Sequence, residues 1–284
     1  MTTLRYYLAA VHAPDWLALG SHDLARVFGC GLSGIDIRIA RPDLGPSPDE
    51  RRLAELVHGA GLEVRCHAWV GVRAADGTSA ARARHGAVLG KALGTWATML
   101  GAQMASGNFE RDVWRGPNGG ANPDAVEFVD QYITAFYDEN RTAWLADLGF
   151  ADPSEHYRAA DLDGDGDLDN ELPARVVTRF ARRGIMAYQG DPGVVRRKLE
   201  RGRKVAGPTM ALSWWSSVGR KDPRTGEVVG RASTTLRGCA ERWAGIDEWV
   251  GYVGFGAASQ LVQGNSEHPA LVALVGEMSG RAVA

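Results

Sequence analysis

The chain has 284 residues, 45% of them hydrophobic and 23% charged, which suits one large folded domain with a sizeable core. Its 32 basic and 34 acidic residues give a formal charge of −2 and are mixed along the sequence. This balance argues against binding of nucleic acid or of an anionic membrane, and it favours a neutral or small partner.

Apolar segments of strand length alternate with longer helical patterns along the chain. The strand-like segments are residues 4–12, 34–41, 63–71, 102–110, 143–150, 184–189, 209–216 and 251–259. The helical patterns cover residues 15–28, 48–59, 78–100, 123–141, 174–182, 191–203, 233–248 and 268–278. This alternation is typical of parallel βαβ units and predicts a single-domain α/β fold, a (β/α)8 TIM-type barrel over residues 1–284. An open doubly wound sheet is the alternative, but no GxGxxG sequence follows the first strand.

Cap residues mark several predicted helix boundaries. Ser47-Pro48 and Asn122-Pro123 each place a capping side chain before a proline at the first helical position, and Gly61 and Gly207 follow helix ends. Long stretches after the fourth strand (residues 111–122) and after the fifth interrupt this pattern. Loops that follow strands form the face on which barrel enzymes carry their sites.

Alternation along the second and third predicted strands directs polar side chains into the barrel. Three isoleucines at alternate positions of the second strand form its outer face, so Asp36 points inward. By the same reasoning Arg65, His67 and Trp69 point inward from the third strand. Charged groups inside a barrel are paired with an opposite charge or take part in a functional site. Asp36 and Arg65 therefore either close the barrel as a structural network or contribute to a site.

Glu110 lies where the fourth predicted strand ends, and Asn108 precedes it on the same face of the strand. Side chains at the C-terminal ends of barrel strands are the usual source of catalytic groups. We therefore expect Glu110 to act in a site at this end of the barrel, with Asn108 beside it.

Residues 151–173 form a long loop after the fifth strand with the sequence of a calcium site. Asp161, Asp163 and Asp165 match the start of a DxDxDG loop, which places oxygen ligands at alternate positions and Gly166 at the tight turn. We expect a structural Ca²⁺ ion, and the alternative is an acidic, solvated loop. The expected ligands are Asp161, Asp163, Asp165, Asp167, Asp169 and Glu171.

Nine tryptophans are many for this length, and several lie at or just beyond predicted strand ends, where flat rings can stack on sugar faces. Trp69 and Trp114 are candidates for such stacking. Adjacent Trp214 and Trp215 must point to opposite faces of their strand, so at most one lines a site, and we assign Trp214 to it. Rings that only fill the barrel mouth or the helix layer are the alternative.

These features resemble the glycoside hydrolase-like barrels found among phage and bacterial cell-wall lysins. The resemblance spans most of the chain and rests on Asn108-x-Glu110, on Tyr188-Gln189 in the sixth strand, and on the aromatic strand at 251–259. It implies a glycoside hydrolase that acts on cell-wall peptidoglycan or a related polysaccharide. It also implies that Glu110 is the general acid and that Tyr188 and Gln189 line the sugar subsites.

Glycoside hydrolysis generally needs a second carboxylate as base or nucleophile. Four aspartates occupy or follow predicted strands, and the sequence does not choose among them: Asp36, Asp112, Asp147 and Asp191. By strand position Asp147 and Asp36 rank first for this role. A non-catalytic glycan-binding or structural barrel of a phage-like particle is therefore an alternative function. A third is a metal-dependent sugar isomerase or lyase that uses His67, Asp36 and Glu110. No GxSxG, HExxH or P-loop sequence supports other catalytic classes.

Cellular location is predicted from the cysteines and the N-terminal segment. Cys30, Cys66 and Cys239 are isolated and odd in number, which argues against a disulfide framework and predicts buried thiols. The N-terminal segment lacks the pattern of a signal peptide, and no apolar run approaches the length of a membrane span. We expect a protein made in the cytoplasm and released by lysis or carried on a virion or injection particle.

Overall fold

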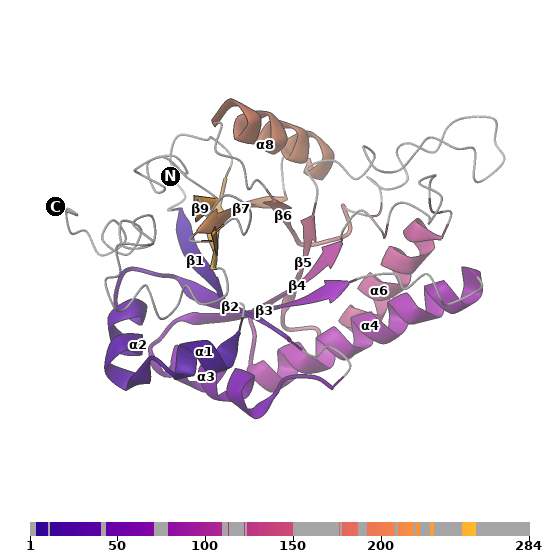
Figure 1. The fold of residues 1–284 in the computed structure, drawn as a ribbon. Coiled ribbons are helices and arrows are strands. Elements are labelled where there is room, and N and C mark those ends of the chain that lie inside the picture. Colours follow the sequence, from indigo (N-terminus) through magenta and orange to yellow (C-terminus); the bar gives the residue numbers. More distant parts are fainter. Residues whose placement is uncertain are drawn as a thin grey trace.

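Eight parallel strands close into a barrel, which confirms the predicted (β/α)8 architecture (Figure 1). The computed structural model describes residues 4–10, 12–40, 44–70, 79–109, 113, 122, 124–149, 176, 178–186, 192–207, 210–218, 220–221, 228–229 and 246–253. The barrel strands are β1 (Arg5–Ala10), β2 (Gly34–Arg38), β3 (Glu63–Val70), β4 (Met104–Phe109), β5 (Trp144–Gly149), β6 (Arg182–Met186), β7 (Ala211–Val218) and β10 (Glu248–Val253). They pair in this order, and β10 returns to pair with β1.

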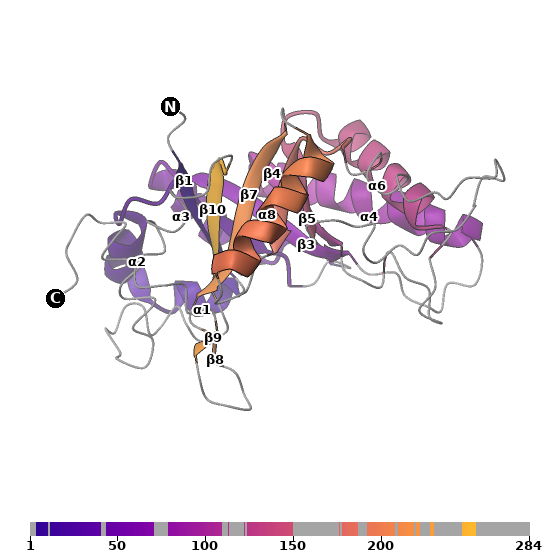
Figure 2. The same ribbon diagram turned by 90° about the horizontal axis from the view of Figure 1, so that it is seen from above.

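Helices cover the outside of the barrel. They are α1 (Ala13–Leu17), α2 (Gly20–Phe28), α3 (Pro48–Gly59), α4 (Ser79–Leu100), α6 (Ala125–Glu139) and α8 (Pro192–Ala206). The long helices α4 and α6 run side by side at the lower right of Figure 1, and α8 lies across the top of the barrel, opposite α1 and α3. Figure 2 shows α8 lying along the barrel wall, and the short ribbon of β8 (Arg220–Lys221) and β9 (Val228–Val229) beyond the end of β7. No helix in the described ranges is both long and apolar enough to cross a membrane.

The predicted boundaries agree best where local signals are strong. Helix α3 begins and ends at the predicted residues, because Ser47 and Glu50 form a capping box in which each side chain accepts a hydrogen bond from the other's backbone N–H. Strands β6 and β10 begin two and three residues earlier than predicted, whereas β4 and β7 begin two residues later. Arg182 and Glu248 are therefore strand residues, although their sequence context predicts helix ends.

The buried side chains form two groups on either side of the strands. The larger group lies between strands and helices and includes Ile35, Ile37 and Ile39 of the β2 segment, as the alternation predicts. A smaller group of Tyr7, Ala9, Trp215 and Val250, with Met186 packed against it, fills part of the lumen. The lumen is thus packed with side chains and is not an open channel.

Three glycines allow α4 and α6 to approach closely. Gly86, Gly90 and Gly94 recur at every fourth position of α4 and so form one stripe along it. A Cβ at Gly90 would collide with the carbonyl oxygen of Tyr132, and one at Gly86 with that of Phe128. The absence of side chains on this stripe therefore sets the distance between the two helices.

We expect Gly90→Ala to destabilise the protein by about 2–3 kcal/mol, because overpacking forces a well-packed interface apart. In an open helical position the same change is stabilising by up to about 1 kcal/mol. Gly59→Ala in α3 is the matched control, since a Cβ there meets nothing within 4 Å. Urea unfolding of both variants measures the difference, and equal stability of the two would contradict the close contact.

Candidate functional site

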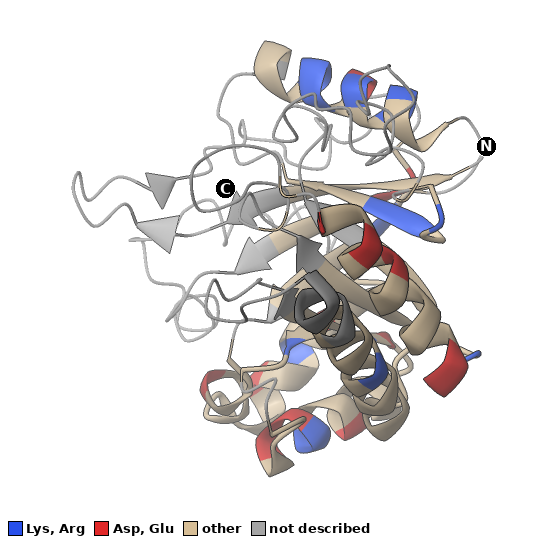
Figure 3. Cartoon of the chain, turned by 90° about the vertical axis from the view of Figure 1, so that its right-hand side faces the viewer, with Lys and Arg blue, Asp and Glu red and all other residues tan. Residues whose placement is uncertain are grey.

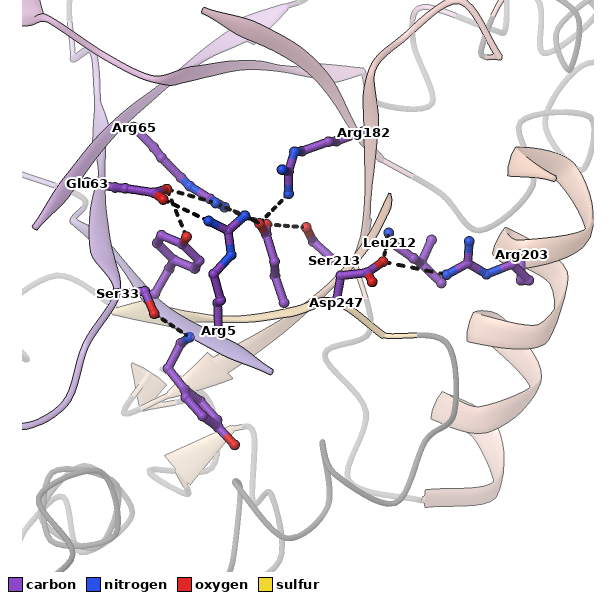
Figure 4. Close-up of polar contacts among 12 residues, drawn as sticks. Arg5, Ser33, Glu63, Arg65, Arg182, Arg203, Leu212, Ser213 and Asp247 are labelled. Atoms are coloured by element: carbon purple, nitrogen blue, oxygen red, sulfur yellow. Dashed lines mark hydrogen bonds and ion pairs between the residues drawn. The ribbon is translucent and has the colours of Figure 1, made fainter. Parts of the chain in front are cut away.

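The N-terminal end of the barrel is closed by a buried carboxylate that binds three arginines. Glu248 is fully buried and accepts hydrogen bonds from Arg65 at 2.6 and 2.8 Å, from Arg5 at 2.6 Å and from Ser213 at 2.9 Å. Arg182 also donates to it. Figure 4 shows these donors converging from β1, β3, β6 and β7. Because Arg5, Arg182 and Glu248 are the first residues of their strands, the cluster joins the strands where they enter the barrel.

A second carboxylate extends this network toward solvent. Glu63, the first residue of β3, accepts from Arg5 at 2.7 Å, from the hydroxyl of Tyr7 at 2.8 Å and from Arg65 at 3.3 Å. The guanidinium of Arg65 also stacks on the Tyr7 ring, 3.3 Å from its centroid. The ring fits there because Gly34 has no side chain, and a Cβ on Gly34 would lie 2.9 Å from it.

The pKa values in this network follow from burial and charge. Burial alone would raise the pKa of the Glu248 carboxyl, but hydrogen bonds from Arg65 and the charges of Arg65, Arg182 and Arg5 lower that pKa to about 2. Burial raises the pKa of the Tyr7 hydroxyl, and the nearby carboxylates add to this effect. Near neutral pH, Glu248 is therefore ionised and Tyr7 is a neutral hydrogen-bond donor.

This network, made of Arg5, Glu63, Arg65, Arg182 and Glu248, is hereafter the basal network. It lies at the end of the barrel opposite the usual position of active sites, which is the C-terminal end of the strands. Its role is to close the barrel. The sequence predicts a barrel-closing role for Arg65 as one alternative, but it predicts Asp36 as the partner of Arg65.

The correct partner of Arg65 is Glu248, whereas Asp36 pairs with His67 farther along the lumen. His67 lies four residues beyond Glu63 on β3, which is about 13 Å along a strand. Its Nδ1 lies 2.7 Å from Oδ1 of Asp36, and both side chains are buried. In the neutral ring with a proton on Nδ1, His67 donates to Asp36, and its Nε2 is then an acceptor.

Two further polar atoms lie beside this pair without a hydrogen-bond partner among the described residues. They are Oδ2 of Asp36 and Oγ of Ser106, the residue that pairs with His67 across β3 and β4. Buried polar atoms are normally satisfied by protein, water or ligand. Asp36, His67 and Ser106, hereafter the lumen triad, therefore offer a place for a water molecule or a polar substrate group.

Trp215 forms the apolar wall of this place. Its ring meets the ring of His67 edge on, with centroids 5.9 Å apart and planes at 86°. Trp214 points the other way, into the layer under the helices, where its ring lies 6.4 Å from that of Trp249. The assignment of Trp214 to the site from the sequence is thus corrected, because alternation places Trp215 in the lumen.

The other predicted residues are located only by their strands or lie outside the described residues. Asn108 and Trp69 pair across β4 and β3 near the C-terminal ends of these strands, and Asp147 lies in β5. Phe109 is the last residue of β4, and Glu110 is the next residue in the sequence. Outside the described residues lie Glu110, Trp114, Tyr188, Gln189, Asp161, Asp163, Asp165, Asp167, Asp169 and Glu171. Calcium binding stays a prediction.

Metal and thiol chemistry finds little support in the described part of the chain. No group of three or more His, Cys, Asp or Glu side chains there is arranged to hold a metal ion. Cys30 and Cys66 are buried and free, and burial raises the pKa of both thiols. They are thus inert core residues, as predicted, whereas Cys239 lies outside the described residues.

Comparison with solved structures identifies glycoside hydrolases that share this barrel. A GH18 chitinase from Pseudoalteromonas aurantia has a TM-score of 0.60 at 9% identity, covering 96% of this chain and 99% of the chitinase. An endo-beta-N-acetylglucosaminidase variant from Cordyceps militaris, in complex with fucosyl-N-acetylglucosamine-Asn, has a TM-score of 0.58 at 11% identity, covering 98% and 90%. A D-psicose 3-epimerase reaches 0.56 at 12% identity, covering 98% and 100%. No family model and no curated protein matches the sequence. The chain therefore has a glycoside hydrolase-like (β/α)8 barrel, and at these identities the likeness concerns the fold.

Proposed function

We propose that this protein is a glycoside hydrolase that cleaves glycans containing N-acetylhexosamine, such as cell-wall peptidoglycan, with Glu110 as the general acid. The observation that supports the proposal is that β4 ends at Phe109, at the edge of the barrel where such enzymes act, and Glu110 is the next residue in the sequence. The lumen triad lies behind this edge and supplies a polar floor, and Trp215 supplies an apolar wall.

The unassigned second carboxylate is compatible with this proposal. Most glycosidases use two carboxyl groups, but GH18 enzymes rely on a group of the substrate in place of the second one. A GH18 chitinase is among the proteins that share this barrel. In substrate-assisted cleavage Glu110 acts alone as acid and base, and neither Asp36 nor Asp147 is needed as nucleophile.

The spacing of Asn108 and Glu110 supports the same comparison. The Cordyceps militaris variant carries an Asp-to-Asn and a Glu-to-Gln exchange two positions apart. Asn108 and Glu110 are separated by the same interval at the end of β4. We propose that Asn108 orients the reacting sugar by hydrogen bonds, since an amide can both donate and accept.

The lumen triad has a supporting part in this scheme. Asp36 fixes the ring of His67 through Nδ1, and the opposite nitrogen is directed away from this bond. We assign His67 a positioning role, in which its second ring nitrogen orders a water molecule beneath the sugar.

Oligosaccharides with and without acetyl groups test the proposal. We expect release of shorter products from N-acetylglucosamine oligomers and from peptidoglycan, and no release from the deacetylated oligomers, which lack the participating acetamide. Mass spectrometry of the products measures both. Cleavage of the deacetylated oligomers would contradict substrate assistance. Retention on glycan without any cleavage would instead identify a non-catalytic binding barrel.

A further inference from the structure

Helix α8 carries a high density of positive charge. Between Arg196 and Lys204 it has six basic residues and one acidic residue, a formal charge of +5 within a chain whose net charge is −2. Figure 3 shows basic residues on successive turns of this helix, whereas acidic and basic residues are mixed on the helices of the opposite flank. The even balance of the whole chain thus conceals one locally basic element.

The basic residues are held at the surface because α8 buries its apolar side. Val195, Leu199 and Ala206 are buried against the barrel. On the side away from the barrel, a hollow of about 440 Å³ is lined by Val194, Arg197, Lys198, Glu200, Arg201 and Lys204. The residues at 194, 197, 201 and 204 follow helical spacing and form one stripe about 15 Å long.

Two basic side chains of the stripe, and a third beside it, have no acidic partner in the part of the chain that the structure describes. The carboxylate of Glu200 is paired with Arg196 at 2.9 Å, and Arg203 is directed to Asp247 and to backbone carbonyls. Arg197, Lys198 and Lys204 have no acidic partner among the described residues. These three cations, hereafter the free cations of α8, repel one another unless an anion lies between them.

We propose that this stripe binds a linear polyanion with phosphate groups along its chain, attached to the cell wall that contains the glycan. This inference rests on the proposed function for the choice of polymer. Arginine and lysine together suit phosphate, the first by paired hydrogen bonds and the second as a compact charge. Helix α8 starts after β6, at the end of the barrel where the site lies, so a polymer on the stripe leads toward that site.

Other anionic partners fit the stripe less well. A membrane-binding helix inserts its apolar face into lipid, but the apolar face of α8 is already buried against the barrel. Duplex DNA is usually read by an element that enters a groove, and α8 lies flat along the barrel wall (Figure 2). A single flexible chain of phosphates needs neither an exposed apolar face nor a protruding element that enters a groove.

The variant Arg197→Glu/Lys204→Glu tests the proposal, with Arg51→Glu/Lys91→Glu as control. The control changes net charge equally at exposed positions on α3 and α4. With labelled polyphosphate as probe, the wild type should lose affinity with salt at a logarithmic slope of about −2, as expected for three released counterions. The α8 variant should bind at least about tenfold more weakly at low salt, with a slope near zero. The control should behave like the wild type.

Further arms identify the source of the anion and separate this proposal from the enzymatic one. The wild type should sediment with cell walls and should do so less after their phosphate polymers are removed, whereas the α8 variant should show no such difference. Equal loss of binding in the α8 and control variants, or preference for duplex DNA or anionic vesicles, would overturn the proposal. Cleavage of neutral N-acetylglucosamine oligomers should be unchanged in the α8 variant. If the wild type does not cleave these oligomers, the proposed enzymatic function is contradicted, whereas the binding of the polyanion is not.

Discussion

Glu110→Gln is expected to lower the rate of glycan cleavage by about 10²–10⁴-fold, the usual contribution of a positioned general acid. Glutamine has nearly the same shape as glutamate but cannot transfer a proton to the departing sugar oxygen. Affinity for the oligomer should change little, so the loss should appear in kcat and not in KM. Product release from N-acetylglucosamine oligomers, followed over time, measures the effect.

Two controls separate loss of chemistry from loss of structure. Glu127→Gln makes the same exchange on the exposed side of α6 and should leave the rate unchanged. Both variants should unfold at the same temperature as the wild type, because glutamine at Glu110 preserves the volume of the side chain. Wild-type activity of Glu110→Gln would remove Glu110 from the mechanism.

Glu248→Gln should destabilise the fold by about 3–5 kcal/mol, the range measured when one member of a buried ion pair is removed. The variant leaves Arg65 fully buried, with Arg5 and Arg182 beside it and no carboxylate at their centre. Glu63→Gln is the matched control within the same network. Its side chain is 33% exposed, so water can replace part of the lost interaction and the destabilisation should be smaller.

The effect of Glu248→Gln should depend on pH in a defined direction. The pKa of this carboxyl in the folded chain, about 2, lies below its usual value of 4.5. Its contribution to stability is therefore complete above pH 4.5 and is lost as the pH falls toward 2. The difference in free energy of unfolding between wild type and variant should shrink over this interval by roughly 3 kcal/mol. A constant difference between these pH values, measured by urea unfolding, would contradict the basal network as its source.

The barrel could be predicted because each element carries its own local signal. The capping box at Ser47 and Glu50 fixes the start of α3 without help from the rest of the chain. In β2 and β3, apolar residues on one face and polar residues on the other correctly direct Asp36 and His67 into the lumen. The alternation of inward and outward side chains depends only on neighbouring residues of one strand, so it can be predicted from a single sequence.

The partners within the lumen could not be predicted, because they depend on the register between strands far apart in the sequence. Glu248 contacts Arg65 and Arg5 only once β10 has paired with β1, and nothing near Glu248 in the chain indicates this. The orientation of the two tryptophans could have been found. Ser213 shares a face with Trp215, and a serine at an inner position of β7 indicates that this face is the polar one.

The basal network also has a consequence for the order in which the protein assembles. The hydrogen bond between Arg5 and Glu248 joins residues 243 positions apart, so the first and last described strands must meet before it forms. Until β10 has been synthesised, Arg5 and Arg65 have only Glu63 as a carboxylate partner within the network, and Arg182 has none there. Closure of the barrel is therefore a late event in synthesis, and the nascent chain exposes the unpaired edge of β1 until β10 is made.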